Sequence, residues 1–426
     1  MLPRDPRLPD RARERPEVTT LAHALNQFMA LVEALPAEDA SLENARGRFA
    51  LGDVLADHDI PPFDASAVDG FAVRALDLLT ARDDAPVSLP VRGESRAGLR
   101  WHAELEPGAV MRSFVGSRIP PGADAVATDD QVQVALDRAS FARPLEPGAG
   151  IRLRASDLAR GEVLLAGGTR LDAAALGLLA SQGRTSVRAR CRPRIAIVSM
   201  VDDRTTAGDA ASRQPTASAA VSVLRAQIES AGGVPVAMTQ GQGVDPMASL
   251  LGHAFSAADA VVVLGGASGP QRDDLGVALG RLGVASALLD VRMRPGGLLV
   301  IGAKDRIPVL GLAGDLLSAW MTFEIFVRPA IRRMLGDPRP YRALVEVELG
   351  KRAKPSQGFV LFARARIEYR GGEVHARPVA KQSPFASAVE CDALLVLPER
   401  EAPLEIGERC DALLLSGSGS ARLPFH

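Results

Sequence analysis

Cysteine and net charge are both scarce in this sequence of 426 residues, and each shortage excludes a class of protein. The three cysteines, Cys191, Cys391 and Cys410, are odd in number and widely spaced, which excludes a disulfide framework and a paired Cys/His zinc site. We therefore expect a reducing, cytoplasmic environment. The formal net charge is −1, so no overall field draws the chain to nucleic acid or to an acidic membrane.

Long apolar runs are also missing. No stretch of about 18 uncharged apolar residues occurs, so no membrane-spanning helix is predicted. Residues 1–16 are charged and rich in proline and lack the apolar segment of a secretory signal, so we expect a disordered extension. Hydrophobic residues make up 47% of the chain and charged residues 24%, as in ordinary globular proteins. At about 150 residues per domain, the length suggests several domains.

The periodicity of the apolar residues predicts a chain that combines α/β and β domains. Helical spacing over 18–35 predicts a helix. Short alternating runs between Gly and Pro predict antiparallel β structure over 86–145. From 193 to 337, apolar strand patterns such as 194–200 alternate with amphipathic helices, which predicts a parallel sheet with helices on both faces. Residues 338–426 are again rich in strand patterns and predict a small β domain.

One stretch fits neither a helix nor a strand. Residues 61–73, PPFDASAVDGFAV, place the carboxylates of Asp64 and Asp69 five residues apart. The prolines restrict the backbone and Asp-Gly is a common turn pair, so the carboxylates could bond nearby backbone N–H groups. Alternatively, the loop is a rigid one that presents carboxylate oxygens to a cation or a polar ligand. These residues alone leave both interpretations open.

Loops after the strands of the α/β region are the other candidates, because ligands in parallel sheets bind at the carboxyl ends of strands. In residues 199–204, SMVDDR, Asp202 and Asp203 follow a strand and suit Mg²⁺ or an ordinary exposed loop. Residues 265–274, GGASGPQRDD, either offer backbone N–H groups to an anion or form a tight strand-to-helix turn with Asp273 or Asp274 as the N-cap. This loop has neither the Gly-Lys-Ser/Thr of a phosphate-binding P-loop nor the GxGxxG of a dinucleotide fold.

Two more loops hold polar residues beside glycines. In residues 311–318, GLAGDLLS, Asp315 either caps the following helix or faces a ligand. In residues 293–302, MRPGGLLVIG, a Pro-Gly-Gly bend lies near Arg292 and Arg294. Such arginines bind phosphate and other oxyanions, or are simply solvated.

Taken in order, these motifs resemble the MoeA family of molybdopterin molybdotransferases, which includes the E domain of gephyrin. The stretch at 61–73 is similar to the PxFDNSAMDGYAV loop of that family. The resemblance covers roughly residues 20–415. Its further segments are GSRIPPGADAVA, IRLRASDLARGEVLLAGGTRLDAAALGLLASQG, RPRIAIVS, ADAVVVLGGASG, MRPGG, GLAGD and PVAKQSPFASAVECDALLVLPE.

The resemblance implies an enzyme that inserts molybdenum from molybdate into adenylylated molybdopterin, with Mg²⁺-assisted release of AMP. It implies a homodimer with the site shared between subunits. Other cofactor-biosynthesis proteins or a molybdoenzyme are possible partners. The implied site comprises Asp69 and Asp273 as catalytic residues, Asp202, Asp203 and Asp273 as metal ligands, and Asp64, Ser66, Gly70, Gly265, Gly266, Ser268, Arg294, Gly314, Asp315 and Ser318 as substrate-binding residues.

The resemblance also implies how the domains are divided. The expected parts are an N-terminal linker and dimerisation domain at 17–55 and 161–192, an inserted β-rich domain at 56–160, a three-layer α/β molybdopterin-binding-like domain at 193–337, and a C-terminal β-barrel domain at 338–426.

Several family motifs are altered. The family has PGKP where Gly296 is followed by Gly297, so a lysine is missing. It has STGDEL where this chain has SMVDDR, and it has GLPGNPVS where Asp315 replaces a neutral asparagine. The sequence is therefore compatible with an active enzyme that has a drifted site. It is equally compatible with a degenerate paralogue that carries molybdopterin or binds a partner protein without turnover.

Overall fold

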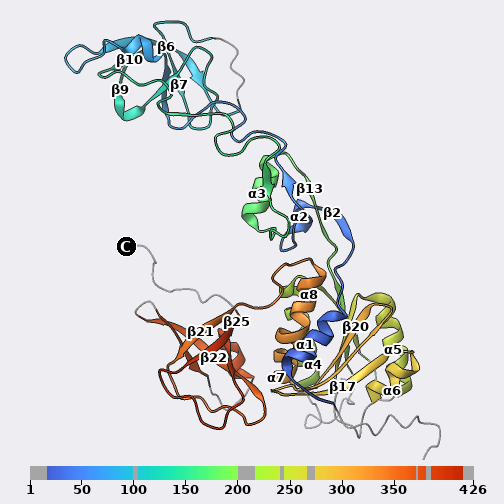
Figure 1. Ribbon diagram of the computed structural model, residues 1–426. Helices are drawn as coiled ribbons and strands as arrows, with labels where there is room; N and C mark the ends of the chain where they lie inside the picture. Colours follow the sequence, from blue (N-terminus) through green and yellow to red (C-terminus); the bar gives the residue numbers. More distant parts are fainter. Residues whose placement is uncertain are drawn as a thin grey trace, which may run out of the picture. The chain divides into compact units, whose positions relative to one another are not determined.

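The computed structural model describes residues 17–98, 104–199, 216–239, 244–265, 274–370, 373–379 and 385–415 (Figure 1). The expected disordered extension at 1–16 lies outside these ranges. The chain divides into two units. The first unit takes residues up to Leu51, Arg170–Asp172 and the chain from Ser186 onward, and the second takes Gly52–Thr169 and Ala173–Thr185. None of the described helices is long and apolar enough to cross a membrane.

A seven-stranded sheet forms the centre of the first unit. Its strands, in spatial order, are β1 (Glu17–Thr19), β17 (Ala285–Val291), β19 (Leu298–Lys304), β20 (Ile307–Leu312), β16 (Ala260–Leu264), β14 (Arg194–Ser199) and β15 (Val234–Thr239). Its helices are α1 (Leu21–Ala30), α4 (Thr216–Ala231), α5 (Val244–Ala257), α6 (Asp274–Arg281), α7 (Leu316–Thr322), the π-helical turn η4 (Phe323–Val327) and α8 (Arg328–Met334).

Side-chain alternation along the strands produces the three layers. In β14, Ile197 points to the face covered by α1, α4, α7 and α8, and packs in one core cluster with Leu224 of α4. The neighbouring Val198 points to the opposite face and packs with Leu251 of α5. Because successive strand residues point to opposite faces, a fully apolar strand needs helices on both sides. Figure 1 shows α5 and α6 on the other side of the sheet from α4 and α7, which confirms the predicted three-layer α/β fold.

Two details differ from the sequence prediction. The sheet is parallel except at β19, which runs antiparallel to both β17 and β20 because it forms a hairpin with β20. The helix predicted over 18–35 is shorter. Residues Glu17–Thr19 instead pair with β17 as an edge strand, and α1 begins after Thr20, whose side chain accepts a hydrogen bond from the His23 N–H at 3.2 Å. Thr20 directly follows the strand and is the N-cap of the helix.

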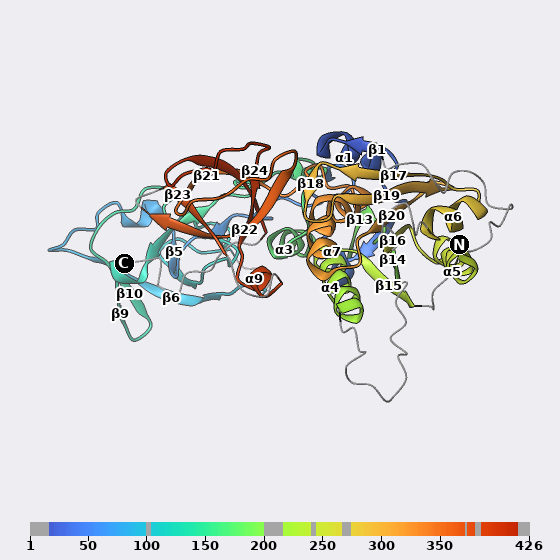
Figure 2. The ribbon, with the colours of Figure 1, turned by 90° about the horizontal axis from the view of Figure 1, so that it is seen from below.

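The C-terminal part of the first unit is a closed β-barrel (Figure 2). The ring of pairings runs β22–β23–β21–β25–β24 and returns to β22, which confirms the predicted small barrel. These strands are β21 (Leu344–Leu349), β22 (Val360–Arg370), β23 (Glu373–Pro378), β24 (Ala393–Leu397) and β25 (Arg409–Leu414), with the short helix α9 at Ala386–Val389. The two-residue strand β18 (Met293–Arg294) leaves the α/β sheet and pairs in parallel with β22, so it joins the two parts.

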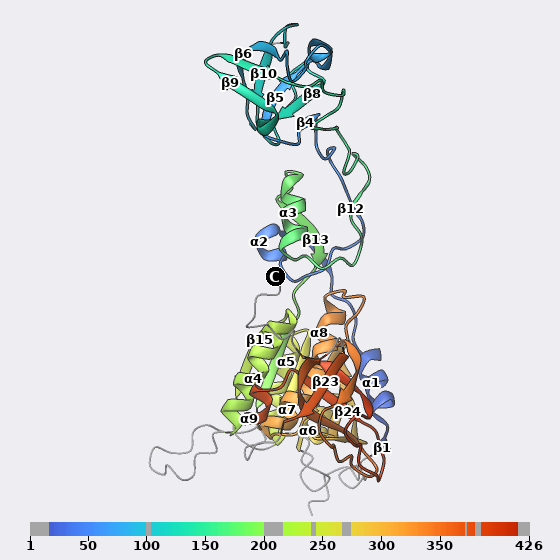
Figure 3. The same ribbon diagram turned by 90° about the vertical axis from the view of Figure 1, so that its left-hand side faces the viewer.

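A smaller element of the first unit pairs β2 (Ala37–Ser41) with β13 (Ser186–Arg190), beside α2 (Leu42–Ala45). The second unit contains a six-stranded sheet (Figure 3). Its strands, in order, are β8 (Ala125–Thr128), β5 (Gly70–Val73), β7 (Val110–Ser113), β6 (Val87–Ser95), β10 (Arg138–Phe141) and β9 (Val132–Ala135). The unit also holds β3 (Val54–Leu55), β4 (Ala65–Ser66), β11 (Ile151–Arg152), β12 (Val163–Leu165), α3 (Ala173–Ser181) and the 3₁₀ turns η2 (Ala75–Leu78) and η3 (Asp129–Gln131). The finer division into domains stays a prediction.

A buried ion-pair network connects the helical run α7–η4–α8 to the chain around the barrel. The Glu324 carboxylate accepts from Arg342 at 2.9 Å and from the amide of Gln227 at 2.8 Å. Arg342 also donates to the Leu415 carbonyl at 2.6 Å. Nearby, burial first and the charge of Arg342 second lower the pKa of Arg328 to about 10. A carboxylate among these buried cations holds them in place.

We therefore expect Glu324→Gln to lower the free energy of unfolding by about 3 kcal/mol, since it leaves buried guanidinium groups without their counter-charge. The matched control is Glu346→Gln, which breaks the exposed pair between Glu346 and Arg409. That change should cost less than about 1 kcal/mol. Urea unfolding followed by circular dichroism measures both. Equal effects of the two substitutions would contradict the assignment.

Candidate functional site

The topology of the α/β sheet collects several predicted loops at one edge. Strands β14, β16 and β20 are parallel neighbours, and β17 runs the same way because both β17 and β20 are antiparallel to β19. Their carboxyl ends therefore lie at the same edge. Gly265 follows β16, Gly314 follows β20 and Arg294 follows β17. This is the edge at which ligands bind in doubly wound sheets.

Two of these loops approach each other backbone to backbone. The Gly265 N–H donates to the Leu312 carbonyl at 3.1 Å. A Cβ atom added at Gly314 would lie 3.2 Å from the Gly265 Cα, so a side chain at Gly314 would press on the neighbouring loop. Gly265 has a φ of +82°, which favours glycine. The sequence requires glycine at both positions, and the surface they form is made of backbone.

The Pro-Gly-Gly bend packs over the start of α7. A Cβ atom at Gly296, whose φ is +81°, would lie 2.4 Å from the Thr322 hydroxyl and 3.4 Å from the Ser318 Cβ. Ser318 is 6% exposed beneath this bend. The bend and α7 are therefore packed tightly together, and Ser318 has little surface with which to meet a ligand.

Asp315 is the N-cap of α7. Its Oδ1 accepts from the Ser318 N–H at 2.9 Å, which satisfies one of the first free amides of the helix. One carboxylate oxygen is thus committed to the local structure, as the capping interpretation anticipates. Its negative charge is also favourable beside a helix N-terminus.

Arg294 folds back over the same bend. Its guanidinium carbon lies 3.8 Å from the ring centroid of Phe359. A Cβ atom added at Gly297 would lie 3.1 Å from the Arg294 Nη1. Arg294 Nη1 also donates to the Met293 carbonyl at 3.3 Å. The guanidinium therefore lies over position 297, held by an aromatic ring from the start of the barrel.

In the second unit, the two carboxylates of the 61–73 loop each bind a distant backbone amide. Asp64 Oδ1 accepts from the Arg154 N–H at 2.7 Å. Asp69 Oδ1 accepts from the Val115 N–H at 2.7 Å. Both aspartates are exposed, and no described residue donates a hydrogen bond to the Oδ2 atom of Asp69. Both carboxylates bind backbone amides, which holds the loop in place. The structural interpretation, in which the carboxylates bond backbone amides, is therefore compatible with the interpretation of a rigid loop that presents oxygens to a ligand.

The residues between these aspartates fix the path of the loop. Ser66 is 2% exposed, and its hydroxyl donates to the Val68 carbonyl at 2.6 Å. Gly70 lies in β5, where an added Cβ would stand 1.7 Å from the Ala127 carbonyl oxygen. Only glycine fits there. Ser66 and Gly70 thus act through the backbone in this structure.

The loop borders a pocket of about 350 Å³. Ser66, Val115 and Gly116 contribute to its wall, and Arg152 is the charged side chain on it. The hydrogen bond from Val115 to Asp69 holds this carboxylate beside the wall. Figure 3 shows the short strand β4, which carries Ser66.

Sequence reasoning missed Arg112. Its guanidinium lies 4.9 Å from the Phe71 ring centroid and makes a two-pronged ion pair with Asp129. Hydrogen bonding to Asp129 raises the pKa of Arg112, and the charge of Asp69 adds to the effect. No local motif marks Arg112, because its partners come from β5 and η3.

The remaining predicted residues lie outside the described ranges. They are the expected metal ligands and the rest of the glycine-rich loop, namely Asp202, Asp203, Gly266, Ser268 and Asp273. The structure thus groups Asp64, Ser66, Asp69 and Gly70 in the second unit, and it groups Gly265, Arg294, Gly314, Asp315 and Ser318 at the sheet edge of the first unit.

A three-layer α/β domain with glycine loops at its strand ends, followed by a closed β-barrel, defines a multidomain α/β plus β-barrel protein. The MoeA N-terminal region (domain I and II) matches residues 19–183, and the MoeA C-terminal region (domain IV) matches residues 346–415. The chain belongs to the MoeA family.

Several known proteins are similar to this chain over most of its length. The chain is 29% identical to the molybdopterin molybdenumtransferase of Bacillus subtilis over 395 residues, covering 91% of this chain and 92% of that protein. It is also 29% identical to molybdopterin molybdenumtransferase 2 of Mycobacterium tuberculosis, covering 84% and 90%. The crystal structure of the molybdopterin biosynthesis moeA protein from Pyrococcus horikoshii matches 93% of this chain and all of that chain, with a TM-score of 0.75 and 25% identity.

The hydrogen bond from Val115 to Asp69 predicts how two substitutions differ. Asp69→Asn keeps an oxygen acceptor and should leave the melting temperature nearly unchanged. Asp69→Ala removes the acceptor and should cost about 1 kcal/mol. Thermal unfolding measured by circular dichroism compares them. If Asp69→Asn is as destabilised as Asp69→Ala, the charge of Asp69, and not its hydrogen bond, holds the loop.

Proposed function

We propose that this protein is a molybdopterin molybdotransferase of molybdenum cofactor biosynthesis. In this proposal it inserts molybdenum from molybdate into adenylylated molybdopterin, with Mg²⁺-assisted release of AMP. The observation that carries it is the backbone contact of Gly265 with Gly314 at the sheet edge, since glycine loops allow phosphate groups to approach main-chain amides closely. The names of the relatives support the same activity.

Arg294 would supply the cation at this edge. The family lysine is missing at Gly297, but the guanidinium of Arg294 already lies over that position. Phe359 restricts the side chain, so less conformational entropy is lost when an anion binds. A guanidinium also binds a phosphate with two parallel hydrogen bonds, which an ammonium group cannot do.

In the second unit, Asp69 is the residue that we propose to take part in the reaction. Its Oδ1 is held by the N–H of Val115, which belongs to the pocket wall, so we infer that its Oδ2 faces the substrate. A carboxylate oxygen in that position can accept a hydrogen bond from a polar group of the substrate. Asp64 would keep the loop in shape through Arg154.

Magnesium is the implied cofactor. When bound, Mg²⁺ would screen the charge of the pyrophosphate. The proposed ligands Asp202, Asp203 and Asp273 suit this hard cation chemically, but they lie outside the described residues. Among the described residues of the edge, Asp315 is a carboxylate whose Oδ1 caps α7, so we assign it to the helix and not to the ion.

We further propose that the protein works as a homodimer with the site shared between subunits, as the family resemblance implies. Other cofactor-biosynthesis proteins or a molybdoenzyme would receive the product.

A second candidate is a catalytically degenerate carrier of molybdopterin, or an adaptor that binds a partner protein. It is favoured by Asp315, which adds negative charge where a bound anion is expected and which costs binding energy unless a cation lies between them. The two candidates differ in turnover and not in ligand binding.

The first test is turnover. Purified protein with adenylylated molybdopterin, Mg²⁺ and molybdate should release AMP only when molybdate is present. Asp69→Asn should lower the rate by at least about 100-fold, as expected for loss of an essential carboxylate. Asp77→Asn is the matched control, because Asp77 also binds a loop amide, that of Gly108 at 2.8 Å, away from the pocket. Tight ligand binding without AMP release would favour the carrier.

The second test concerns the cation. Arg294→Met should weaken binding of adenylylated molybdopterin by about tenfold or more, and Arg294→Lys should restore part of it. Arg306→Met is the control, because Arg306 lies at the opposite strand ends, in the turn between β19 and β20. Calorimetric titration measures all three variants. Unchanged affinity in Arg294→Met would remove Arg294 from the site.

A further inference from the structure

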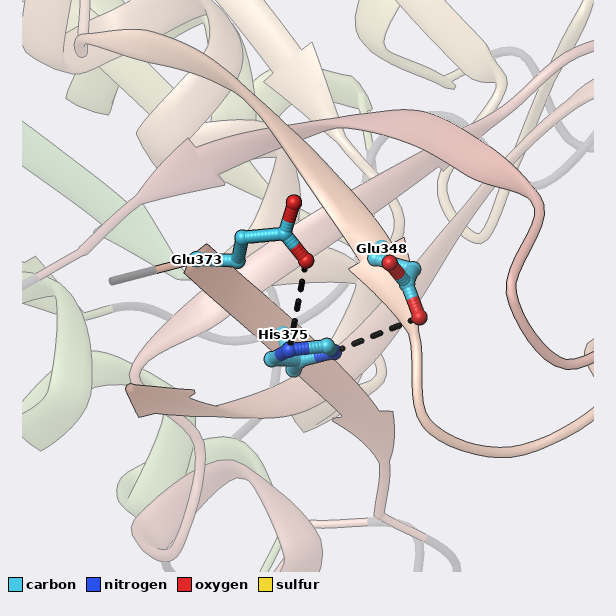
Figure 4. Close-up of side chains that lie close together, drawn as sticks. All are labelled: Glu348, Glu373 and His375. Atoms are coloured by element: carbon cyan, nitrogen blue, oxygen red, sulfur yellow. Dashed lines mark ion pairs between the residues drawn. The ribbon is translucent and has the colours of Figure 1, made fainter. Parts of the chain in front are cut away.

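Three potential metal ligands converge on the outer face of the C-terminal barrel (Figure 4). Glu348 of β21 is the register partner of His375 of β23, and Glu373 precedes His375 by two residues on the same strand. The next register pair along these strands, Leu349 and Ala376, is fully buried. Strand alternation therefore turns Glu348, Glu373 and His375 outward together.

One possible ligand atom from each of the three side chains lies within 4.8 Å of the other two, and the two contacts of His375 are longer than hydrogen bonds. His375 Nδ1 lies 3.5 Å from a Glu348 carboxylate oxygen, and His375 Nε2 lies 4.0 Å from a Glu373 oxygen. A hydrogen bond would bring such atoms to about 3 Å. Two ligands of a tetrahedral ion, each about 2.1 Å from the metal, are about 3.4 Å apart. An ion binds one imidazole nitrogen, here Nδ1 beside Glu348, so Glu373, whose side chain is 60% exposed, turns from Nε2 toward that side to complete the site.

The arginines near this cluster form ion pairs with other carboxylates. Arg409 pairs with Glu346 at 2.9 Å, and Arg377 pairs with Glu368 at 3.6 Å. Among the described side chains, His375 is the one basic residue within ion-pair distance of Glu348 or Glu373. A hollow of about 170 Å³, lined in part by both glutamates, lies beside them. The rest of its lining comes from Glu346, Val347, Val374 and Arg409.

From this geometry we propose that Glu348, Glu373 and His375 bind a divalent transition-metal ion of the Zn²⁺ type. An imidazole together with carboxylates suits zinc, whereas magnesium prefers oxygen ligands alone. Water completes the coordination. The site is separate from the sheet edge of the proposed reaction and does not depend on it.

The position of the site gives the ion a structural role. The pairing of β21 with β23 closes the barrel through two register pairs, whereas the other neighbouring strands of the ring share between four and six. An ion held by Glu348 on one strand and by Glu373 and His375 on the other bridges this shortest pairing. An ion that binds the folded barrel and not the unfolded chain stabilises the folded state by mass action.

The test is a Zn²⁺ titration of the full chain after chelator treatment, followed by calorimetry and thermal unfolding. The native protein should bind one ion and melt at a higher temperature with it. His375→Gln and Glu373→Gln should each weaken binding by about tenfold or more. The control is His253→Gln, since His253 is an exposed histidine of α5 in another part of the first unit.

A second measurement uses the native protein, so its result does not depend on whether the variants fold. Co²⁺ bound to the native protein should give visible absorption bands, and Zn²⁺ should abolish them while a large excess of Mg²⁺ should not. Equal Zn²⁺ affinity in His375→Gln and native protein would overturn the proposal. Displacement of Co²⁺ by Mg²⁺ would also overturn it, because it would show non-specific binding to carboxylates.

Discussion

The constraint on which this structure depends is the common direction of β14, β16, β20 and β17. Parallel strands require a crossover between them, and the crossovers here are the helices that cover both faces. Their carboxyl ends meet at one edge as a consequence. Segments that are far apart in the sequence, such as those at Gly265, Arg294 and Gly314, are brought to one edge without any local signal that links them.

At that edge, glycine has a steric reason at each position that the structure describes. A side chain at Gly314 would press on Gly265, and one at Gly296 would clash with the Thr322 hydroxyl. The same close packing leaves main-chain groups at the surface, and it places the guanidinium of Arg294 where the family has a lysine. The altered motif is therefore compatible with a retained anion site, because an arginine on one side of the bend takes the place of a lysine on the other.

The fold could be predicted from the sequence where the apolar pattern was long. The buried strand predicted at 194–200 is confirmed over Arg194–Ser199, because a continuous apolar run needs cover on both faces of the sheet. The strand-rich segments predicted after 338 are confirmed as the barrel. The antiparallel direction of β19 could not be predicted, because it depends on the turn to β20 and on a neighbouring strand, β17, outside the hairpin. The short strand at Glu17–Thr19 was missed for a similar reason, as its one partner, β17, lies far along the chain.

The sequence selects candidate site residues, but it does not reveal their contacts. The pattern selected Asp64, Asp69 and Asp315, yet their amide partners Arg154, Val115 and Ser318 emerge only from the fold. The cluster of Glu348, Glu373 and His375 was invisible for the same reason. Two strands contribute to it, and only the register between them places the residues side by side.

The most direct test of the central claim, that the shared strand edge binds the ligand, is hydrogen exchange of backbone amides with and without adenylylated molybdopterin. The account predicts slower exchange around Gly265, over residues 292–298 and over residues 313–318. It predicts no change at the opposite strand ends, around Asp305 and Arg306. Protection at that opposite end, or no protection at the shared edge, would contradict the account.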